Sequence, residues 1–200
     1  MKFLTLEGVD GAGKSSHIEF IADAVRTKGS HVIVTREPGG TELAEKLREA
    51  ILGQPMAPSV ETLLVFAARA DHVAKVIQPA LEAGHYVICD RFTDATFAYQ
   101  GGGNGVSRDL ITRLVDIAHP GLKPHRTLVF DCPYEVASQR MAKSGRKLDR
   151  FEREDRAFFE RVRATYLELA KAEPNRIKVI DASRDAAGVR EQLKRALEGF

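Results

Sequence analysis

The stretch that decides the fold is Gly8-Val9-Asp10-Gly11-Ala12-Gly13-Lys14-Ser15. It matches G-x-x-x-x-G-K-[ST], a pattern typical of phosphate-binding loops, although a chance match in a Gly-rich turn is the alternative. A short apolar run precedes it, and apolar residues at helical spacing follow it, so the loop joins a strand to a helix. Its glycines let backbone N–H groups face a phosphate, and the helix N-terminus adds its positive dipole end. We expect Lys14 at the β- and γ-phosphates and Ser15 at Mg²⁺.

The composition limits the class of protein. The chain has 200 residues, 44% hydrophobic and 29% charged, which suits one globular domain. A net charge of +2 gives no overall basic field, so nucleic acid is not expected as a partner. No apolar run approaches the roughly 20 residues of a membrane span, and nothing resembles a signal peptide. Cys89 and Cys132 are far apart and read as buried thiols in a reducing cytoplasm.

Strand and helix patterns alternate along the chain. After the first strand, apolar runs recur at residues 31–35, 86–90, 126–131 and 177–181. This order predicts an α/β fold of three layers, with a five-stranded parallel sheet and helices on both faces. The expected helices are 15–28, 41–52, 60–83, 93–100, 107–118, 133–143, 153–172 and 185–197. With no repeat and no linker, residues 1–200 are expected to form a single domain.

Charged residues follow two of the predicted strands at the edge where such sheets bind ligands. Arg36 follows the second strand at its carboxyl end, and a turn then leads to Thr41, which can cap the next helix. Asp90 ends the third strand and is a candidate for Mg²⁺ or its waters, with a helix N-cap as the alternative. Arg91 beside it suits a bidentate phosphate contact, which favours the first interpretation.

Two helices offer candidates for a base pocket. Thr96, Tyr99 and Gln100 share one helix face, which could line a pocket or equally face solvent. Phe66 and Arg69 also share a face beside small alanines, although an aromatic residue on a helix more often belongs to the core. A basic, Gly-containing loop over residues 143–150 could close over phosphates as a lid, although basic runs are usually just solvated. The six histidines show no metal-ligand spacing.

Together these motifs resemble the thymidylate kinase family. The resemblance rests on GVDGAGKS at 8–15, REPGGT at 36–41, FAAR at 66–69, DRFTDATFAYQGGG at 90–103 and LDRFE at 148–152. It implies a P-loop NTPase fold with a short lid at about 143–152. It also implies transfer of the ATP γ-phosphoryl group to dTMP, giving dTDP and ADP for dTTP synthesis. Mg²⁺ as cofactor, a cytoplasmic location and a homodimer are further implications.

The resemblance also implies roles for individual residues. The expected ATP contacts come from Gly8, Val9, Asp10, Gly11, Ala12, Gly13, Lys14, Ser15 and Ser16, with Ser15 and Asp90 serving Mg²⁺. The expected dTMP contacts come from Asp10 at the 3′-OH, Arg36 and Arg91 at the phosphate, Phe66 and Arg69 at thymine, Thr96 and Gln100 at the base edge, and Tyr99 at the 2′ position.

Two details concern the subtype. The P-loop has no basic residue between Val9 and Ala12, while the lid has Arg146, Lys147 and Arg150, which resembles the bacterial lid-type arrangement. Catalytic roles are therefore expected for Lys14, Arg91, Asp90 and the lid arginines Arg146 and Arg150. Many family members have the stacking Phe four residues before the Arg, where this chain has Val65.

Other functions remain as alternatives. The nearest is a kinase for another nucleoside or nucleoside monophosphate. A nucleotide-dependent switch or binding module is a second, but the sequence has no N-K-x-D motif for guanine. A catalytically inactive member is a third, which the presence of Lys14, Ser15, Asp90 and the lid arginines argues against.

Overall fold

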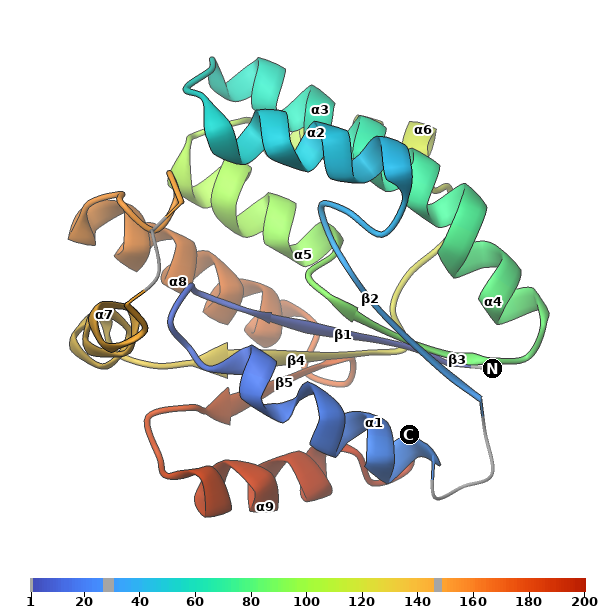
Figure 1. The fold of residues 1–200 in the computed structure, drawn as a ribbon, viewed down its shortest axis with the longest axis vertical. Coiled ribbons are helices and arrows are strands. Elements are labelled where there is room, and N and C mark those ends of the chain that lie inside the picture. Colours follow the sequence, from blue (N-terminus) through green and yellow to red (C-terminus); the bar gives the residue numbers. More distant parts are fainter. Residues whose placement is uncertain (1, 27–30, 146–148) are drawn as a thin grey trace.

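Five short apolar runs form one parallel sheet in the order β2-β3-β1-β4-β5 (Figure 1). In this computed structural model the described residues are 2–26, 31–145 and 149–200. The predicted α/β fold with a five-stranded parallel sheet is confirmed, because parallel strands need covered faces and these runs are apolar almost throughout. The strands are β1 (Lys2–Gly8), β2 (Val32–Arg36), β3 (Tyr86–Asp90), β4 (Arg126–Asp131) and β5 (Ile177–Asp181).

Helices cover both faces of the sheet. Figure 1 shows α1 and α9 below it and α2 to α6 above it, with α7 at the end where the strands stop. The described helices are η1 (Lys14–His17), α1 (Ile18–Arg26), α2 (Glu42–Gly53), α3 (Pro58–His72), η2 (Val73–Ile77), α4 (Gln78–Glu82), α5 (Thr93–Thr96), η3 (Phe97–Gly103), α6 (Arg108–Ala118), α7 (Tyr134–Lys143), α8 (Arg156–Ala172) and α9 (Ala186–Ala196). Within the described ranges, no helix is long and apolar enough to cross a membrane.

Two helices begin where the side chain of the preceding residue caps their first turn. Thr41 caps α2 as expected, since its hydroxyl accepts from the N–H of Ala44 at 3.1 Å. The helix expected from residue 153 begins only at Arg156, because the Asp155 carboxylate caps it by accepting from the N–H of Phe158 at 2.7 Å. The helix expected over 60–83 contains a π turn, η2, between α3 and α4.

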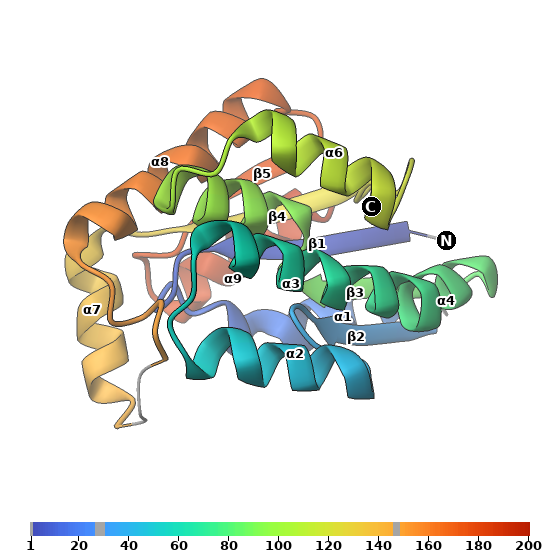
Figure 2. The same ribbon diagram turned by 90° about the horizontal axis from the view of Figure 1, so that it is seen from above.

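The glycines at 101–103 lie inside a helix, whereas the sequence predicted that they follow it. They belong to η3, which packs along α8 (Figure 2). A Cβ on Gly102 would lie 2.0 Å from the hydroxyl of Thr165, and one on Gly103 would lie 2.4 Å from the ring of Phe158. These glycines therefore allow two helices to approach closely, a tertiary requirement that overrides their low helix propensity.

The carboxyl ends of the strands meet at one edge of the sheet. Register places Arg36 beside Asp90 and Asp90 beside Leu6, so the second and third strands end next to the start of the P-loop. β1 lies centrally between β3 and β4, which is the position where the chain order reverses. This is the crevice in which doubly wound sheets bind ligands.

Candidate functional site

The P-loop is shaped by close backbone approaches. Gly8 has φ 131°, and a Cβ there would lie 2.3 Å from the carbonyl oxygen of Phe130 on β4. Gly11 has φ 78°, and its Cβ would lie 2.5 Å from the carbonyl oxygen of Ala137 on α7. Only glycine satisfies both demands, so the loop is held tightly between β1 and η1.

A large cleft of about 630 Å³ opens beside this loop. Its size suits a nucleotide. Among the residues that line it are Asp10, Gly11, Ala12, Gly13, Lys14, Ser15 and Ser16, the central part of the predicted ATP site. Arg140, Met141, Ala182, Arg184 and Val189 continue the lining away from the loop. The predicted ATP residues Gly8 and Val9 lie behind this lining, where Gly8 ends β1 and Val9 is buried.

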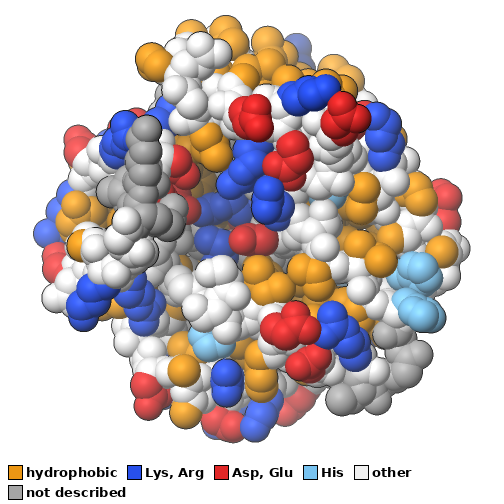
Figure 3. All heavy atoms as spheres, in the orientation of Figure 1, with side chains coloured by type: hydrophobic (Ala, Val, Ile, Leu, Met, Phe, Trp, Pro, Cys, Tyr) orange, Lys and Arg blue, Asp and Glu red, His pale blue; other side chains and the backbone are white. Residues whose placement is uncertain are grey.

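Positive charge gathers in the cleft, where Figure 3 shows Lys and Arg side chains in the hollow of one face. Burial lowers the pKa of Lys14, and the nearby Arg91 lowers it further. Burial and the neighbouring Arg36 likewise lower the pKa of Arg48, which also lines the cleft. Cations held this close and out of water favour an anion between them. The cleft is therefore suited to phosphate groups.

The magnesium ligands expected from the sequence fit the cleft. Asp90 and Ser15 both line it beside Lys14. Oδ1 of Asp90 is buried and has no hydrogen-bond partner in the described structure. Mg²⁺ prefers oxygen ligands, and an unpartnered buried carboxylate oxygen next to a phosphate site is the donor that it needs.

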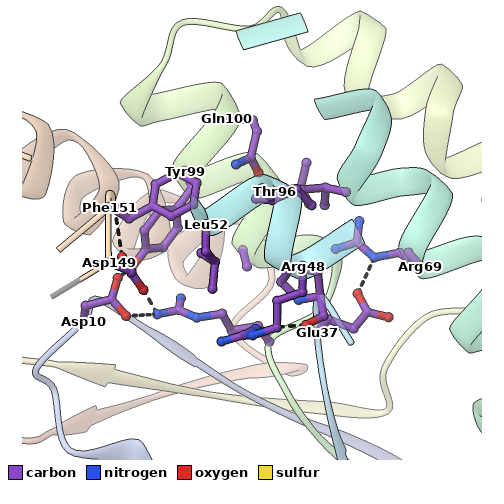
Figure 4. A pocket seen from close by; sticks show the side chains of 15 residues that line it. Asp10, Glu37, Arg48, Leu52, Arg69, Thr96, Tyr99, Gln100, Asp149 and Phe151 are labelled. Carbon is purple, nitrogen blue, oxygen red and sulfur yellow. Dashed lines mark hydrogen bonds and ion pairs between the residues drawn. The ribbon is translucent and has the colours of Figure 1, made fainter. Parts of the chain in front are cut away.

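A second, smaller cavity adjoins the cleft (Figure 4). The two share Asp10, Glu37, Arg48, Arg91 and Asp149 in their linings. In Figure 4, Gln100, Tyr99 and Thr96 lie above the cavity, Arg48 lies below it, and Arg69 and Phe151 lie at opposite ends. Two ligands bound in the two cavities would thus meet at Asp10 and Arg91.

Arg91 is fixed at this junction. Its Nη2 donates to Oδ1 of Asp10 at 2.6 Å and to the hydroxyl of Tyr99 at 3.1 Å, and its Nη1 donates to the carbonyl oxygen of Gly8 at 2.9 Å. The hydroxyl of Tyr99 donates to Oδ2 of Asp10 at 2.7 Å. Burial raises the pKa of Asp10, but Arg91 and Lys14 outweigh it, so the net pKa is lowered and the carboxylate stays charged. Arg91 also has φ 70°, a strained conformation of the kind found at functional sites.

Two residues that line the smaller cavity each have a buried polar atom without a described partner. Nη1 of Arg69 and Oγ1 of Thr96 are both buried with no described hydrogen bond, and both residues line the cavity. The other nitrogens of Arg69 are held, since Nε donates to Glu37 at 2.6 Å and Nη2 to the carbonyl oxygen of Phe92 at 3.0 Å. Buried polar groups are rarely left unsatisfied, so these atoms indicate a polar ligand.

Glu37 also belongs to a group that could in principle hold a metal ion. Within the described residues, Glu37, His72 and Cys89 place possible ligand atoms within 4.8 Å of one another. Both oxygens of Glu37 are already used, by Arg69 and by Nδ1 of His72 at 3.0 Å. Burial holds the pKa of Cys89 well above its usual value, so the thiol stays protonated. We therefore read this group as the support that fixes Arg69.

Comparison with known proteins agrees with this geometry. The family model described as thymidylate kinase matches residues 6–193. The chain belongs to the thymidylate kinase family. It is 55% identical to the thymidylate kinase of Bordetella pertussis over 192 residues, covering 96% of this chain and 92% of that protein. It is 52% identical to that of Cupriavidus necator over 198 residues, covering 98% and 97%. The crystal structure of thymidylate kinase from Ehrlichia chaffeensis matches with a TM-score of 0.80 and 32% identity, covering 98% of each chain.

Phe66 differs from the position that the thymidylate kinase resemblance implied. It is buried and does not line the smaller cavity, whereas Val65 does. The guanidinium of Arg69 lies 4.9 Å from the ring centre of Phe66, and the ring of His119 stacks on it at 6.5 Å. Phe66 therefore supports Arg69 from behind, and Val65 offers the apolar surface that a base would meet.

The lid arginines have different positions. Arg146 lies outside the described residues, so its expected role stays a prediction. Arg150 lines neither cavity, because its Nε donates to the carbonyl oxygen of Ile51 at 2.8 Å and its Nη2 pairs with Glu61. The catalytic role expected for Arg150 would require it to leave these partners. Arg36 lines the larger cleft and is held by Glu45 at 2.9 Å.

Several residues of the site were not found from the sequence. Arg48 on α2 completes the positive cluster, and Glu37 and Glu61 are buried carboxylates that hold Arg69 and the lid. Glu37 stands inside the REPGGT motif, where its charge beside Arg36 was an available signal. Arg48 and Glu61 lie on amphipathic helices among other charges, and no sequence signal distinguishes them.

Proposed function

We propose that this protein is a thymidylate kinase that transfers the γ-phosphoryl group of ATP to dTMP, giving ADP and dTDP for dTTP synthesis. The observation that carries this proposal is the meeting of two cavities at Asp10 and Arg91. One is built on a P-loop, and the other offers two unpartnered polar atoms, Nη1 of Arg69 and Oγ1 of Thr96, to a polar ring. Membership of the family supports the same reaction.

The reaction asks the protein mainly for positioning and positive charge. The phosphate of dTMP is already a nucleophile at neutral pH, so no general base is required. Lys14 binds the β- and γ-phosphates of ATP, and Arg91, with Arg36 and Arg48, holds the phosphate of dTMP in line with them. Asp10 accepts the 3′-OH of dTMP while it keeps Arg91 oriented through their 2.6 Å contact. Arg146 would add positive charge from the lid.

Mg²⁺ would be held by Ser15 and Asp90. It neutralises charge on the phosphate oxygens when it is bound. The chain's own contribution is the buried Oδ1 of Asp90, which has no competing hydrogen bond. Loss of activity after chelation and its return with added Mg²⁺ would support this assignment.

The smaller cavity accounts for the choice of acceptor. Arg69 donates to a thymine carbonyl, Thr96 and Gln100 contact the base edge, and Val65 rather than Phe66 packs on the ring. Tyr99 is fixed by Asp10 and Arg91, so its ring leaves little room for a 2′-OH.

An acceptor panel tests the function. ADP release from ATP and Mg²⁺ would be followed with dTMP, dUMP, dGMP, dCMP, UMP and thymidine. Strong preference for dTMP supports the proposal. Preference for another monophosphate would keep the P-loop chemistry but reject the thymine pocket, and no transfer to any acceptor would favour a binding module.

The assembly is proposed to be a homodimer. Exposed apolar side chains gather on α2, α3 and α6, which pack side by side, and Figure 3 shows hydrophobic side chains along the margin where α2 and α3 lie. These are Leu43, Val60, Leu63, Leu110 and Ile117, with Ile117 78% exposed. Such a patch favours burial against a second copy. Sedimentation at a dimer mass supports this, and a monomer at assay concentration contradicts it.

The architecture is proposed to be one kinase domain over residues 1–200 with a short lid at about 143–152. Its substrates are charged phosphates that do not cross membranes unaided, so we place the enzyme with them in the cytoplasm. Cys89 and Cys132 are both buried and unpaired, which suits a reducing compartment.

A further inference from the structure

Glu61 on α3 is a buried carboxylate beside the smaller cavity. It is 1% exposed, and neither cavity includes it in its lining. Its Oε1 accepts from Nε2 of Gln100 at 2.6 Å and from Nδ2 of Asn104 at 3.1 Å. Its Oε2 pairs with Nη2 of Arg150. All three described partners are donors.

These contacts fix the orientation of the Gln100 amide. Oε1 of Glu61 accepts from both amide side chains, so Gln100 turns its NH₂ group toward Glu61. The carbonyl Oε1 of Gln100 is then left for the cavity, which Gln100 lines and where Figure 4 shows its amide beside Thr96. The cavity thus offers an acceptor at Gln100 and a donor at Nη1 of Arg69.

This pattern matches one class of pyrimidine. Thymine presents an N3–H donor next to its O4 acceptor, whereas a cytosine-type base presents an N3 acceptor next to an amino donor. We propose that Glu61 determines the base specificity of the kinase by fixing the Gln100 carbonyl toward the cavity, where it accepts from the N3–H of thymine. The proposal rests on dTMP being the substrate.

The variant Glu61→Gln tests this with almost no change in shape. Arg150 is charged and can only donate, so the new amide turns its oxygen to Arg150 and its NH₂ group toward Gln100 and Asn104. The Asn104 amide can also turn, so that its own oxygen accepts from that NH₂ group. Gln100 then turns its carbonyl to that NH₂ group and its own NH₂ group into the cavity. The donor and acceptor pattern of the pocket is reversed at this position while the fold is kept.

The readout is the ratio of kcat/KM for dTMP to kcat/KM for 5-methyl-dCMP. We expect Glu61→Gln to lower this ratio roughly 10- to 100-fold, because a matched buried hydrogen bond is exchanged for a mismatched one. The change should be in KM, with kcat for dTMP within about threefold of wild type, since the base contact is the same in the ground state and the transition state. A purely structural role would weaken both substrates alike and leave the ratio unchanged.

Two further variants test whether the orientation of the Gln100 amide causes the change in the ratio. Arg150→Lys keeps Glu61 and a donor in place, so the ratio should stay within about threefold of wild type. In the double variant Glu61→Gln with Arg150→Met, the donor on the Arg150 side is gone, so the new amide oxygen can turn back to accept from Gln100 and Asn104. The ratio should then rise about tenfold above that of Glu61→Gln alone.

The outcomes separate this inference from the proposed function. Wild-type protein that transfers nothing to dTMP would reject the function itself. Active wild-type protein, with an unchanged ratio in a folded Glu61→Gln variant, would overturn the role of Glu61. A double variant that stays as unselective as Glu61→Gln alone would also overturn it.

Discussion

The two halves of the site are built in different ways. The ATP side is formed largely by one continuous stretch, residues 8–16, whose backbone is shaped by glycines. The proposed dTMP side is formed by side chains from the P-loop, the turns after β2 and β3, α2, α3, α5, η3 and the lid, held by buried charges. A backbone site can be recognised from a local motif, whereas a side-chain site depends on partners distant in sequence. We therefore expect substitutions on the ATP side to stop the chemistry and those on the dTMP side to change selectivity.

The largest effect is expected from Lys14→Ala. Lys14 lines the cleft proposed to hold the ATP phosphates, and among the described residues its amine makes a long hydrogen bond to the carbonyl oxygen of Gly8 at 3.4 Å. We expect kcat to fall about 10³-fold or more, because charge at the transferring phosphoryl group is lost. The melting temperature should change little. Steady-state kinetics measure kcat, and thermal unfolding measures the melting temperature. Lys194→Ala on the exposed face of α9 is the control. A near-normal kcat for Lys14→Ala would reject the P-loop assignment.

The next effects are expected from the two lid arginines, because the lid lies next to both halves of the site. Arg146→Ala should lower kcat by roughly 10³-fold if Arg146 acts on the transferring group. Arg150→Ala should instead lower stability, by roughly 1–3 kcal/mol, because it leaves the buried Glu61 without its ion pair. Kinetics and urea unfolding of both variants separate the roles. The reverse outcome, with kcat lost only in Arg150→Ala, would move the catalytic role to Arg150.

A smaller effect, confined to selectivity, is expected at Tyr99. Its ring contacts Phe151 at 5.6 Å and its hydroxyl donates to Asp10. Tyr99→Ala should raise kcat/KM for the ribonucleotide relative to dTMP by roughly 10- to 100-fold, since the ring no longer fills the space at the 2′ position. Tyr99→Phe keeps the ring and should keep the selectivity. Competition assays between the two acceptors measure this, and a Tyr99→Ala variant that still rejects ribonucleotides would refute the steric role.

The last effect is on stability rather than on activity and concerns Glu7, which lies beneath the junction of the two halves. Burial, with the charge of Asp94, raises the pKa of Glu7 from 4.5 to about 8, against the opposing effects of Arg91, Tyr166 and the N–H of Phe92. Between these pH values the folded protein keeps a proton that the unfolded chain releases. Stability should therefore fall as the pH rises through this window, by at most about 1.4 kcal/mol per pH unit, and level off above about 8.

Glu7→Gln should remove this dependence. Urea unfolding at pH 5, 6, 7 and 8 compares the slope of the unfolding free energy in the two proteins. Equal slopes would show that Glu7 does not hold the proton.

The difference between the two halves also explains what the sequence could predict. The strands, the P-loop and the Thr41 cap follow from local patterns, and each is confirmed. The π-helical glycines at 101–103 could not be predicted, because their position is set by Thr165 and Phe158 on α8.

The dTMP side shows the same limit more strongly. Arg69 and Thr96 could be named from a motif, and both line the smaller cavity. Their supports are harder to predict, because Glu37 holds Arg69 from the turn after β2 and Glu61 holds Gln100 from α3, and both contacts join residues distant in sequence. Phe66 and Val65 are neighbours on one helix, and only the packing of His119 and Arg69 decides which of them faces the cavity.

We expect the two substrates to meet at Asp10 and Arg91, with thymine in the smaller cavity. A crystal structure with dTMP and a non-hydrolysable ATP analogue tests it most directly. We expect Nη1 of Arg69, Oγ1 of Thr96 and Oε1 of Gln100 within hydrogen-bonding distance of the base, with the phosphate of dTMP facing the phosphate chain of ATP across Arg91. A thymine ring bound elsewhere, or phosphates that do not converge at Arg91, would contradict it.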